Sequence, residues 1–262
     1  MFGRLEQELS RWAEAGRVAT LWWRDDDAVG PTPALNRLLQ LAGPVPLALA
    51  VIPYPAEPAL AQHLAGCATV TVIQHGWRHT NHAIPPAKKI ELADQPVAVM
   101  LADLGEGRRR LEDLFGTTFR PILTPPWNRI DADLVPLLPS TGFIGLSTSG
   151  PRAARLAAGG LGQVNTHVDP VDWHAGRGFR EAGAVIEDLV RHLAARRTGR
   201  ADAAEPTGIL THHLVMDEAT ERFLADLLTF VAGHPTARWC RIETAIHDAL
   251  QPPVAPVFRV PA

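Results

Sequence analysis

Short apolar runs alternate with segments of helical periodicity along most of the chain. The apolar runs are too short for helices and predict buried strands, which we place at residues 18–23, 45–52, 68–73, 121–124, 143–147 and 208–211. Apolar positions three and four apart predict helices, which we place near the N-terminus and at residues 33–42, 57–65, 98–115, 131–138, 179–197 and 217–232. Regular alternation of this kind is typical of an α/β protein with a mostly parallel sheet, either open or closed into a barrel.

The segments between these elements add little further organisation. Residues 150–160 and 198–206 are rich in glycine, alanine and polar residues and predict surface loops. The tail, residues 252–262, carries four prolines and is not expected to be helical. Because no shift in composition marks a boundary, we expect residues 1–262 to form a single domain, a length that suits one α/β barrel.

Composition excludes several classes of protein. The net charge of −3 lacks the basic surplus of a nucleic-acid-binding protein, so we expect no nucleic-acid partner. Cys67 and Cys240 are the two cysteines, too few for a disulfide framework or a cysteine-based zinc site. No secretory signal or apolar run long enough to span a membrane is visible, and the cytoplasm is the expected compartment.

Polar residues gather where the predicted strands end. Residues 25–27 follow the first strand, residues 75–79 follow the third, and residues 125–127 follow a later one. Residues 169–173 and 212–213 occupy similar positions further along the chain. Because ligand sites of parallel α/β sheets and barrels form at the carboxyl ends of strands, these segments are expected to meet at one rim.

Histidines and aspartates in these segments suit a metal ion. His75 and His79 are four residues apart, a spacing that places two imidazoles on one face of a helical turn, although a loop with incidental histidines has the same pattern. Asp25, Asp26 and Asp27 repel one another unless a cation or protons compensate, although acidic residues also cap helices. Oxygen and nitrogen ligands suit one divalent ion, with zinc preferred and cobalt, nickel, manganese or iron as alternatives. Three such ligands leave open positions for a catalytic water.

With these residues assembled, the chain resembles the polysaccharide deacetylase family, also called the NodB-homology or carbohydrate esterase family 4 type. The resemblance spans about residues 20–215 and depends on five short motifs in the family's order. The first motif, TFDDG, is similar to the sequence at 23–27. It implies Asp25 as general base and Asp26 as metal ligand; a shift by one residue makes Asp26 the base and Asp27 the ligand. The second motif, H(S/T)xxH, implies His75 and His79 as the other ligands.

The second and third motifs each depart from the family pattern. Gly76 stands where the second motif has a hydroxyl residue. The third motif, RxPY, is similar to residues 124–127, with Thr124 in place of an arginine that orients the base in the family. Arg24 or Arg129 is a candidate replacement for that arginine. The resemblance also implies that the backbone N–H of Trp127 stabilises the oxyanion.

The remaining motifs complete the implied site. The fourth, DxxDW, is similar to residues 169–173 and implies Asp169, Asp172 and Trp173 as residues that tune the catalytic histidine or contact substrate. The fifth, LxH, implies His212 as the general acid, with His213 as the alternative. Trp127 and Trp173 are expected to face a sugar, because sugar rings stack on aromatic side chains.

The resemblance implies a distorted (β/α) barrel and hydrolysis of an N- or O-linked acetyl group by metal-activated water. A carbohydrate or sugar-containing substrate is therefore expected. Two alternatives stay open: an amidohydrolase acting on a small non-sugar amide, and a non-catalytic carbohydrate- or metal-binding homologue. The loss of the arginine at Thr124 motivates the second alternative, and the sequence leaves the oligomeric state open.

Overall fold

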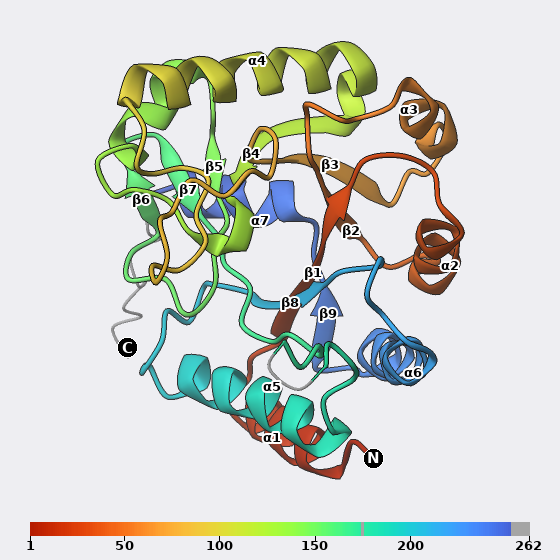
Figure 1. Cartoon of the computed structure of the whole chain (residues 1–262). Helices are drawn as coiled ribbons and strands as arrows, with labels where there is room; N and C mark the ends of the chain where they lie inside the picture. Colours follow the sequence, from red (N-terminus) through yellow and green to blue (C-terminus); the bar gives the residue numbers. More distant parts are fainter. Residues whose placement is uncertain (174–175, 253–262) are drawn as a thin grey trace.

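The computed structural model describes residues 1–173 and 176–252, so the predicted non-helical tail lies almost wholly outside the described residues. Within the described part, the strands belong to one curved sheet surrounded by helices (Figure 1). The strands are β1 (Ala19–Ala28), β2 (Leu47–Val51), β3 (Val70–His75), β4 (Phe119–Thr124), β5 (Gly145–Leu146), β6 (Leu156–Ala158), β7 (Leu161–Gln163), β8 (Thr207–Thr211) and β9 (Ala237–Trp239). The helices are α1 (Gly3–Glu14), α2 (Pro33–Ala42), α3 (Pro58–Leu64), α4 (Val97–Phe115), α5 (Ala182–Arg197), α6 (Glu218–Gly233) and α7 (Ile242–Leu250).

The sheet curls into a distorted barrel. Its strand order is β6-β7-β5-β4-β3-β2-β1-β8, with β9 beside the start of β1, and every pair except β6–β7 is parallel. The chain that leaves β7 then runs beside β8, where Val168 N donates to Gly208 O at 3.1 Å and Leu210 N donates to Val168 O at 2.8 Å. These bonds bring the two sides of the sheet together, and the predicted α/β class and distorted (β/α) barrel are confirmed.

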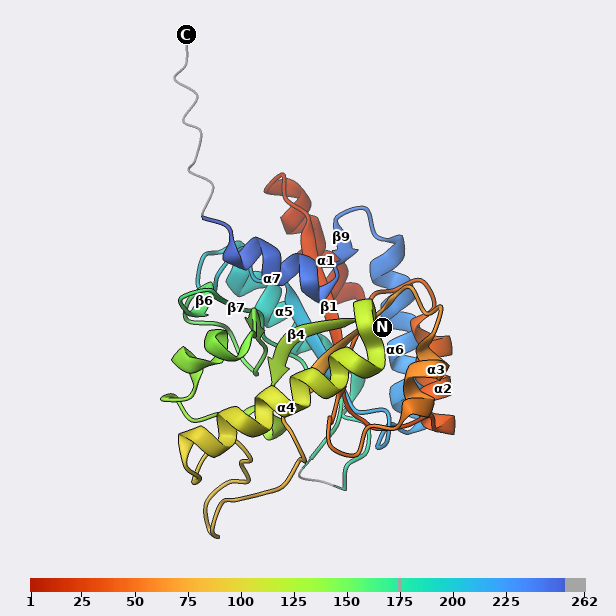
Figure 2. The ribbon, with the colours of Figure 1, turned by 90° about the horizontal axis from the view of Figure 1, so that it is seen from above.

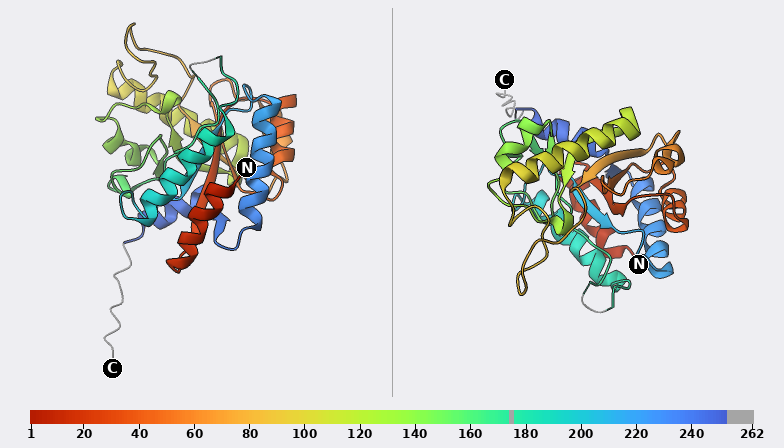
Figure 3. Two further views of the ribbon diagram at one scale, coloured as in Figure 1. Left: turned by 90° about the horizontal axis from the view of Figure 1, so that it is seen from below. Right: turned by 45° about the horizontal axis from the view of Figure 1, so that its top comes forward.

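Alternation along each strand sorts apolar side chains between two cores. Outward-facing residues such as Leu21 and Trp23 pack under the surrounding helices. Inward-facing residues, including Trp22 of β1, fill the barrel interior together with Ile242 and Ile246 of α7. Helix α7 therefore closes one end of the barrel, and the long loops that follow the strands lie at the other end (Figures 2 and 3).

The structure departs from the sequence prediction in several short elements. The helix expected at 131–138 is instead a 3₁₀ segment, η3 (Val135–Thr141), because Pro136 and Pro139 have no N–H to donate. The loop predicted at 150–160 contains β6, and β7, β9 and α7 were not predicted. Strand β1 runs past the predicted end at residue 23 to include all three aspartates. No helix of the described residues combines the length and apolarity needed to cross a membrane.

Candidate metal centre and its pocket

The aspartates of β1 point in different directions because the strand alternates. Asp25 shares the outer face with Trp23, where its carboxylate is fully buried. It accepts a hydrogen bond from Thr211 Oγ1 at 2.7 Å and lies 2.5 Å from His213 Nδ1. Burial alone would lower the pKa of His213, but the Asp25 charge outweighs it and raises that pKa. Asp25 and His213 therefore form a buried pair outside the pocket, on the helix-covered side of the sheet.

Asp26 points to the opposite face and pairs with Arg24. Arg24 Nε lies 2.8 Å from Asp26 Oδ1, and Nη2 donates to Oδ2 at 3.0 Å. The same guanidinium donates to Ser147 Oγ at 2.8 Å and to Asn128 Oδ1 at 2.6 Å. Both members of the pair are buried, with Arg24 at 0% and Asp26 at 2% exposure. The third motif has Thr124 in place of the family's arginine, and the buried guanidinium beside the aspartate comes from Arg24 instead.

Asp27 is the carboxylate that joins the two histidines of the second motif. Its backbone has φ 75°, a left-handed conformation that interrupts the alternation of β1 at its end. Asp27 Oδ1 lies 3.1 Å from His75 Nε2 and 3.4 Å from His79 Nε2. The geometry thus groups Asp27, His75 and His79, whereas Asp26 is held by Arg24.

The tautomer of His75 suits a metal ion. His75 Nδ1 lies 3.1 Å from the carbonyl oxygen of Thr124, which can only accept, so Nδ1 carries a proton. Neutral His75 therefore presents a lone pair at Nε2 to the negatively charged Asp27 Oδ1, a buried atom without another donor among the described residues. A divalent cation facing these atoms would relieve that repulsion, and a backbone carbonyl on the far nitrogen is the usual support of a metal-binding histidine. The three side chains present therefore fit a metal ion.

In the protein without metal, the neighbouring carboxylates favour a proton on His75, which takes the place of the cation. Burial opposes charge on His75, but the nearby Asp26 and Asp27 carboxylates outweigh it and raise its pKa. Burial likewise opposes charge on Asp27, yet the hydrogen bond and the charge of His75 lower its pKa strongly. Burial and the charge of His75 lower the pKa of His79, which leaves the second imidazole neutral and able to ligate.

Glu91 holds the loop that carries the two histidines. Its carboxylate accepts from the backbone N–H groups of Trp77 at 3.0 Å, Arg78 at 2.7 Å and Thr80 at 3.2 Å. A Cβ at Gly76 would overlap this carboxylate, and Gly76 also has φ 54°, so glycine is required there. The departure of Gly76 from the family motif therefore makes room for a buried carboxylate that orders the loop.

His212 reaches the pocket from the end of β8. Its ring lies edge-on to Trp173, with 4.7 Å between the ring centroids. Trp173 Nε1 donates to Asp169 Oδ2 at 2.7 Å, and burial raises the pKa of Asp169 despite this bond. Asp172 does not line the pocket, and its backbone N–H donates to Gly178 O at 2.9 Å.

These side chains share one cavity of about 880 Å³ at the open end of the barrel. Its lining includes both predicted histidine ligands, the predicted acid and the substrate-facing residues, namely Asp26, Asp27, His75, His79, Trp127, Asp169, Trp173 and His212. Asp27, His79, Trp127 and Asn128, all lining residues, have positive φ despite their side chains. Backbone strain of this kind concentrates at functional sites, and here it marks the same cavity.

A second cluster, formed by His167, His192 and Glu205, also places possible ligand atoms close together. Its hydrogen bonds argue against a metal. The backbone N–H of Gly208 donates to His167 Nδ1 at 2.9 Å, so a neutral His167 carries its proton on Nε2, which faces Glu205 at 3.4 Å. This nitrogen has no lone pair to offer, and the cluster is a buried hydrogen-bonded group.

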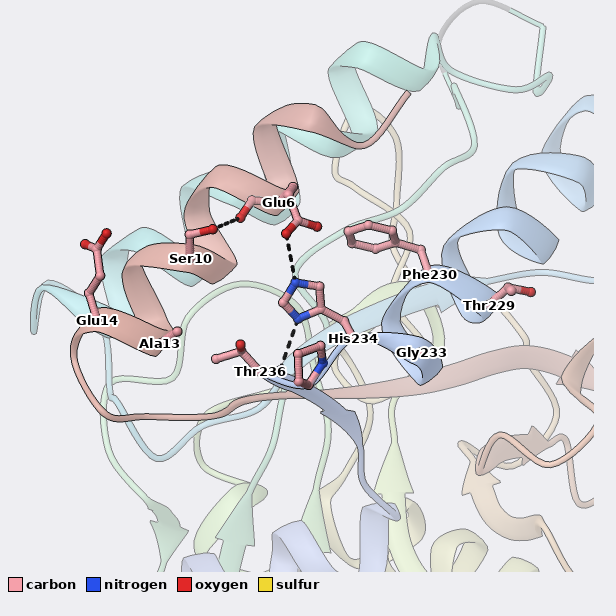
Figure 4. A pocket seen from close by; sticks show the side chains of 10 residues that line it. Glu6, Ser10, Ala13, Glu14, Thr229, Phe230, Gly233, His234 and Thr236 are labelled. Atoms are coloured by element: carbon pink, nitrogen blue, oxygen red, sulfur yellow. Dashed lines mark hydrogen bonds and ion pairs between the residues drawn. The ribbon is translucent and has the colours of Figure 1, made fainter.

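A further pocket lies on the outside of the barrel, between α1 and the end of α6 (Figure 4). His234 Nδ1 accepts from the Thr236 N–H at 3.1 Å, and its Nε2 lies 3.3 Å from Glu6 Oε1. Ser10 donates to the Glu6 carbonyl at 3.0 Å. The polar groups drawn at its centre already have partners, so this pocket offers no comparable chemistry.

Comparison with solved structures places the fold. The chain is similar to a family 4 carbohydrate esterase from Streptomyces lividans in complex with acetate, with 17% identity, coverage of 82% of this chain and 88% of that one, and a TM-score of 0.52. It is also similar to a family 4 carbohydrate esterase from Streptococcus mutans, with 11% identity, coverage of 90% of each chain and a TM-score of 0.56. The chain has the fold of the family 4 carbohydrate esterases.

The same barrel also occurs with other chemistry. A 4-alpha-glucanotransferase from Thermococcus litoralis matches at 11% identity and a TM-score of 0.57, covering 88% of this chain and 40% of that chain. No family model and no curated protein sequence matches the chain. The family 4 esterase fold alone therefore does not decide the activity, which must be argued from the side chains of the pocket.

Proposed function

We propose that this chain is a metal-dependent hydrolase that removes an N- or O-linked acetyl group from a carbohydrate or sugar-containing substrate. The observation that carries this proposal is the grouping of Asp27 Oδ1 with the Nε2 atoms of His75 and His79 at the wall of a large cavity. Asp26 and His212 line that same cavity. The fold shared with an esterase solved with acetate supports the same conclusion.

Asp27, His75 and His79 would hold the ion, with zinc preferred for a carboxylate and two imidazoles. When bound there, a divalent ion supplies Lewis acidity that activates a water molecule and polarises the substrate carbonyl. This assignment follows the second of the two alignments of the first motif. Asp25, the base in the first alignment, faces the opposite side of the sheet and is bound by His213 and Thr211.

Asp26 is the proposed general base and Arg24 its positioning residue. A base must lie beside the attacking water and be fixed in orientation, and the Arg24 guanidinium contacts both oxygens of Asp26. Because Arg24 is itself held by Ser147 and Asn128, the carboxylate has little freedom to rotate. The Asp26 carboxylate would accept the proton that the water loses.

His212 is the proposed general acid, which delivers a proton to the leaving nitrogen or oxygen. Its contact with Trp173, whose indole is fixed by Asp169, holds the imidazole at the cavity wall. On the other side, Trp127 contacts the His79 ring at 4.4 Å between centroids. The backbone N–H of Trp127 would donate to the oxygen on which negative charge develops. The rings of Trp127 and Trp173 both offer faces on which a sugar can stack.

Two matched variants of neighbouring aspartates test the assignment. Purified protein loaded with zinc, cobalt or manganese is assayed for metal content and for acetate release from acetylated sugars. Asp27→Asn should lose the ion. Asp26→Asn should keep one ion per chain and lose kcat by about 10²–10⁴-fold, the usual contribution of a positioned base. His212→Ala should behave like Asp26→Asn.

His247→Ala is the control, because this exposed histidine lies on α7 at the closed end of the barrel. It should leave both metal content and rate unchanged. Equal metal content in Asp27→Asn and the parent would refute the ligand set. Full activity in Asp26→Asn would remove Asp26 as the base. Stoichiometric metal without hydrolysis of any acetylated sugar would refute the proposed reaction while leaving the metal site standing.

A further inference from the structure

Two tryptophans flank the proposed reaction centre, and each has a cation beside its ring. Trp127 contacts the metal-ligand candidate His79, and Lys89 Nζ lies 5.9 Å from the centroid of the Trp127 ring. Trp173 contacts His212, and the Arg177 guanidinium lies 6.0 Å from the Trp173 centroid. The cavity is therefore bounded on two sides by an aromatic face with a positive charge next to it.

A third cation joins the first of these sides. Arg129 lines the cavity, and its Nη1 donates to the Lys89 carbonyl at 2.8 Å. This bond ties the loop that carries Lys89 to the segment that follows Trp127. Lys89, Arg129 and Arg177 form no ion pair with a carboxylate in the part of the chain that the structure describes.

The acidic residues of the cavity are already engaged. Arg24 neutralises Asp26, and Asp27 faces the two histidines. Asp169 accepts from the Trp173 indole at 2.7 Å and from the Val171 N–H at 2.8 Å. The carboxylates therefore lie deep and have partners, whereas the cations lie toward the rim, and the field at the cavity mouth favours a negatively charged ligand.

We propose that the substrate is a sugar that bears an anionic group, a phosphate or a carboxylate, in addition to its acetyl group. That the substrate carries an acetyl group rests on the proposed function. That it carries a negative charge rests only on the cations at the rim of the cavity. The apolar face of the sugar would lie on Trp127 or Trp173 while the anion contacts Lys89, Arg129 or Arg177. Such cations raise the rate of encounter and discriminate against neutral or cationic ligands.

The test measures equilibrium binding of deacetylated products, which requires no turnover. Calorimetric titration of the metal-loaded protein compares glucosamine, glucosamine 6-phosphate and muramic acid, whose charges are ammonium alone, ammonium with phosphate, and ammonium with carboxylate. We expect at least one anionic probe to bind about tenfold more tightly than glucosamine, with the preference shrinking as salt rises. The probe that gains affinity identifies phosphate or carboxylate as the anion.

Variants separate the rim cations from the metal, which also attracts anions. Lys89→Gln, Arg129→Gln and Arg177→Gln should each reduce the preference by about threefold, and the triple variant should abolish most of it. Lys88→Gln is the matched control, because Lys88 is exposed next to Lys89 but does not line the cavity. Equal affinities for all probes, or a preference that survives in the triple variant, would overturn the proposal. Because binding is measured, failure to hydrolyse acetylated sugars would refute the proposed function without touching this result.

Discussion

Removal of the Arg24 side chain should destabilise the protein far more than removal of an exposed arginine. In Arg24→Met the Asp26 carboxylate, 2% exposed, would lose both of its guanidinium contacts, at 2.8 and 3.0 Å. Leaving one member of a buried ion pair without its partner typically costs about 3–5 kcal/mol. We therefore expect the free energy of unfolding, measured by chemical denaturation, to fall by about that amount, a large part of the stability of an ordinary domain.

A double variant separates lost charge pairing from lost packing. In Arg24→Met with Asp26→Asn no buried charge is left unpaired, so the double variant should be more stable than Arg24→Met by about 2 kcal/mol. The control is Arg37→Met, which removes a pair at 2.7 Å between Arg37, whose side chain is 50% exposed, and Glu221, whose side chain is 22% exposed, and should cost less than about 1 kcal/mol. Equal losses in Arg24→Met and Arg37→Met, or no recovery in the double variant, would refute the assignment of Arg24 as the partner of Asp26.

Other variants test the loop of the metal ligands and the buried second cluster. Gly76→Ala should lose bound metal and about 2–4 kcal/mol of stability, since its Cβ would overlap Glu91 and lie 2.5 Å from Pro126 Cδ at φ +54°. Gly160→Ala, at φ +78° with nothing within 4 Å, should cost only about 1 kcal/mol and keep the metal. Burial lowers the pKa of His192 to about 2, so only the unfolded chain binds a proton there near the ordinary value of 6.5. Stability should therefore fall as the pH drops below that value, and His192→Gln should flatten the fall by up to about 1.4 kcal/mol per pH unit in denaturation experiments from pH 7 to 5. His192→Gln should also keep the full metal content by elemental analysis; loss of metal would restore the second cluster as a metal site.

The larger elements were predictable because hydrophobic periodicity and strand-end polarity are local signals. The apolar runs located the buried strands, and the alternation of strands with helices indicated the parallel sheet. The short strands β6 and β7 carry only three residues each, too few for a periodic signal. Helix α7 does carry apolar residues at helical spacing and could have been predicted, but its role in closing the barrel depends on contacts with residues such as Trp22, far away in the chain.

The sequence predicted which types of residue form the candidate site, but not which of the three adjacent aspartates takes which role. Both histidines and His212 line the cavity, as the motif order suggested. The aspartates could not be separated by composition, since each is a carboxylate next to a strand. Strand alternation would have paired Arg24 with Asp26 had β1 been predicted to extend through residue 28. Glu91 was missed altogether, because a single glutamate in a long loop carries no signal until the loop is folded around it.

The placement of the guanidinium on β1 has a structural consequence for the rest of the site. Arg24 and Asp26 are two residues apart on one strand face, so the pair forms from β1 itself and does not depend on the end of β4. The end of β4 has a different role, because the backbone carbonyl of Thr124 accepts from His75 Nδ1 and from the Gly76 N–H, at 3.1 and 3.0 Å. The end of β1 thus fixes the proposed base, and the end of β4 fixes the tautomer of a proposed ligand. The double exchange Arg24→Thr with Thr124→Arg would therefore not restore the family pattern here, because the longer side chain would have to displace the packing around Thr124, which is fully buried.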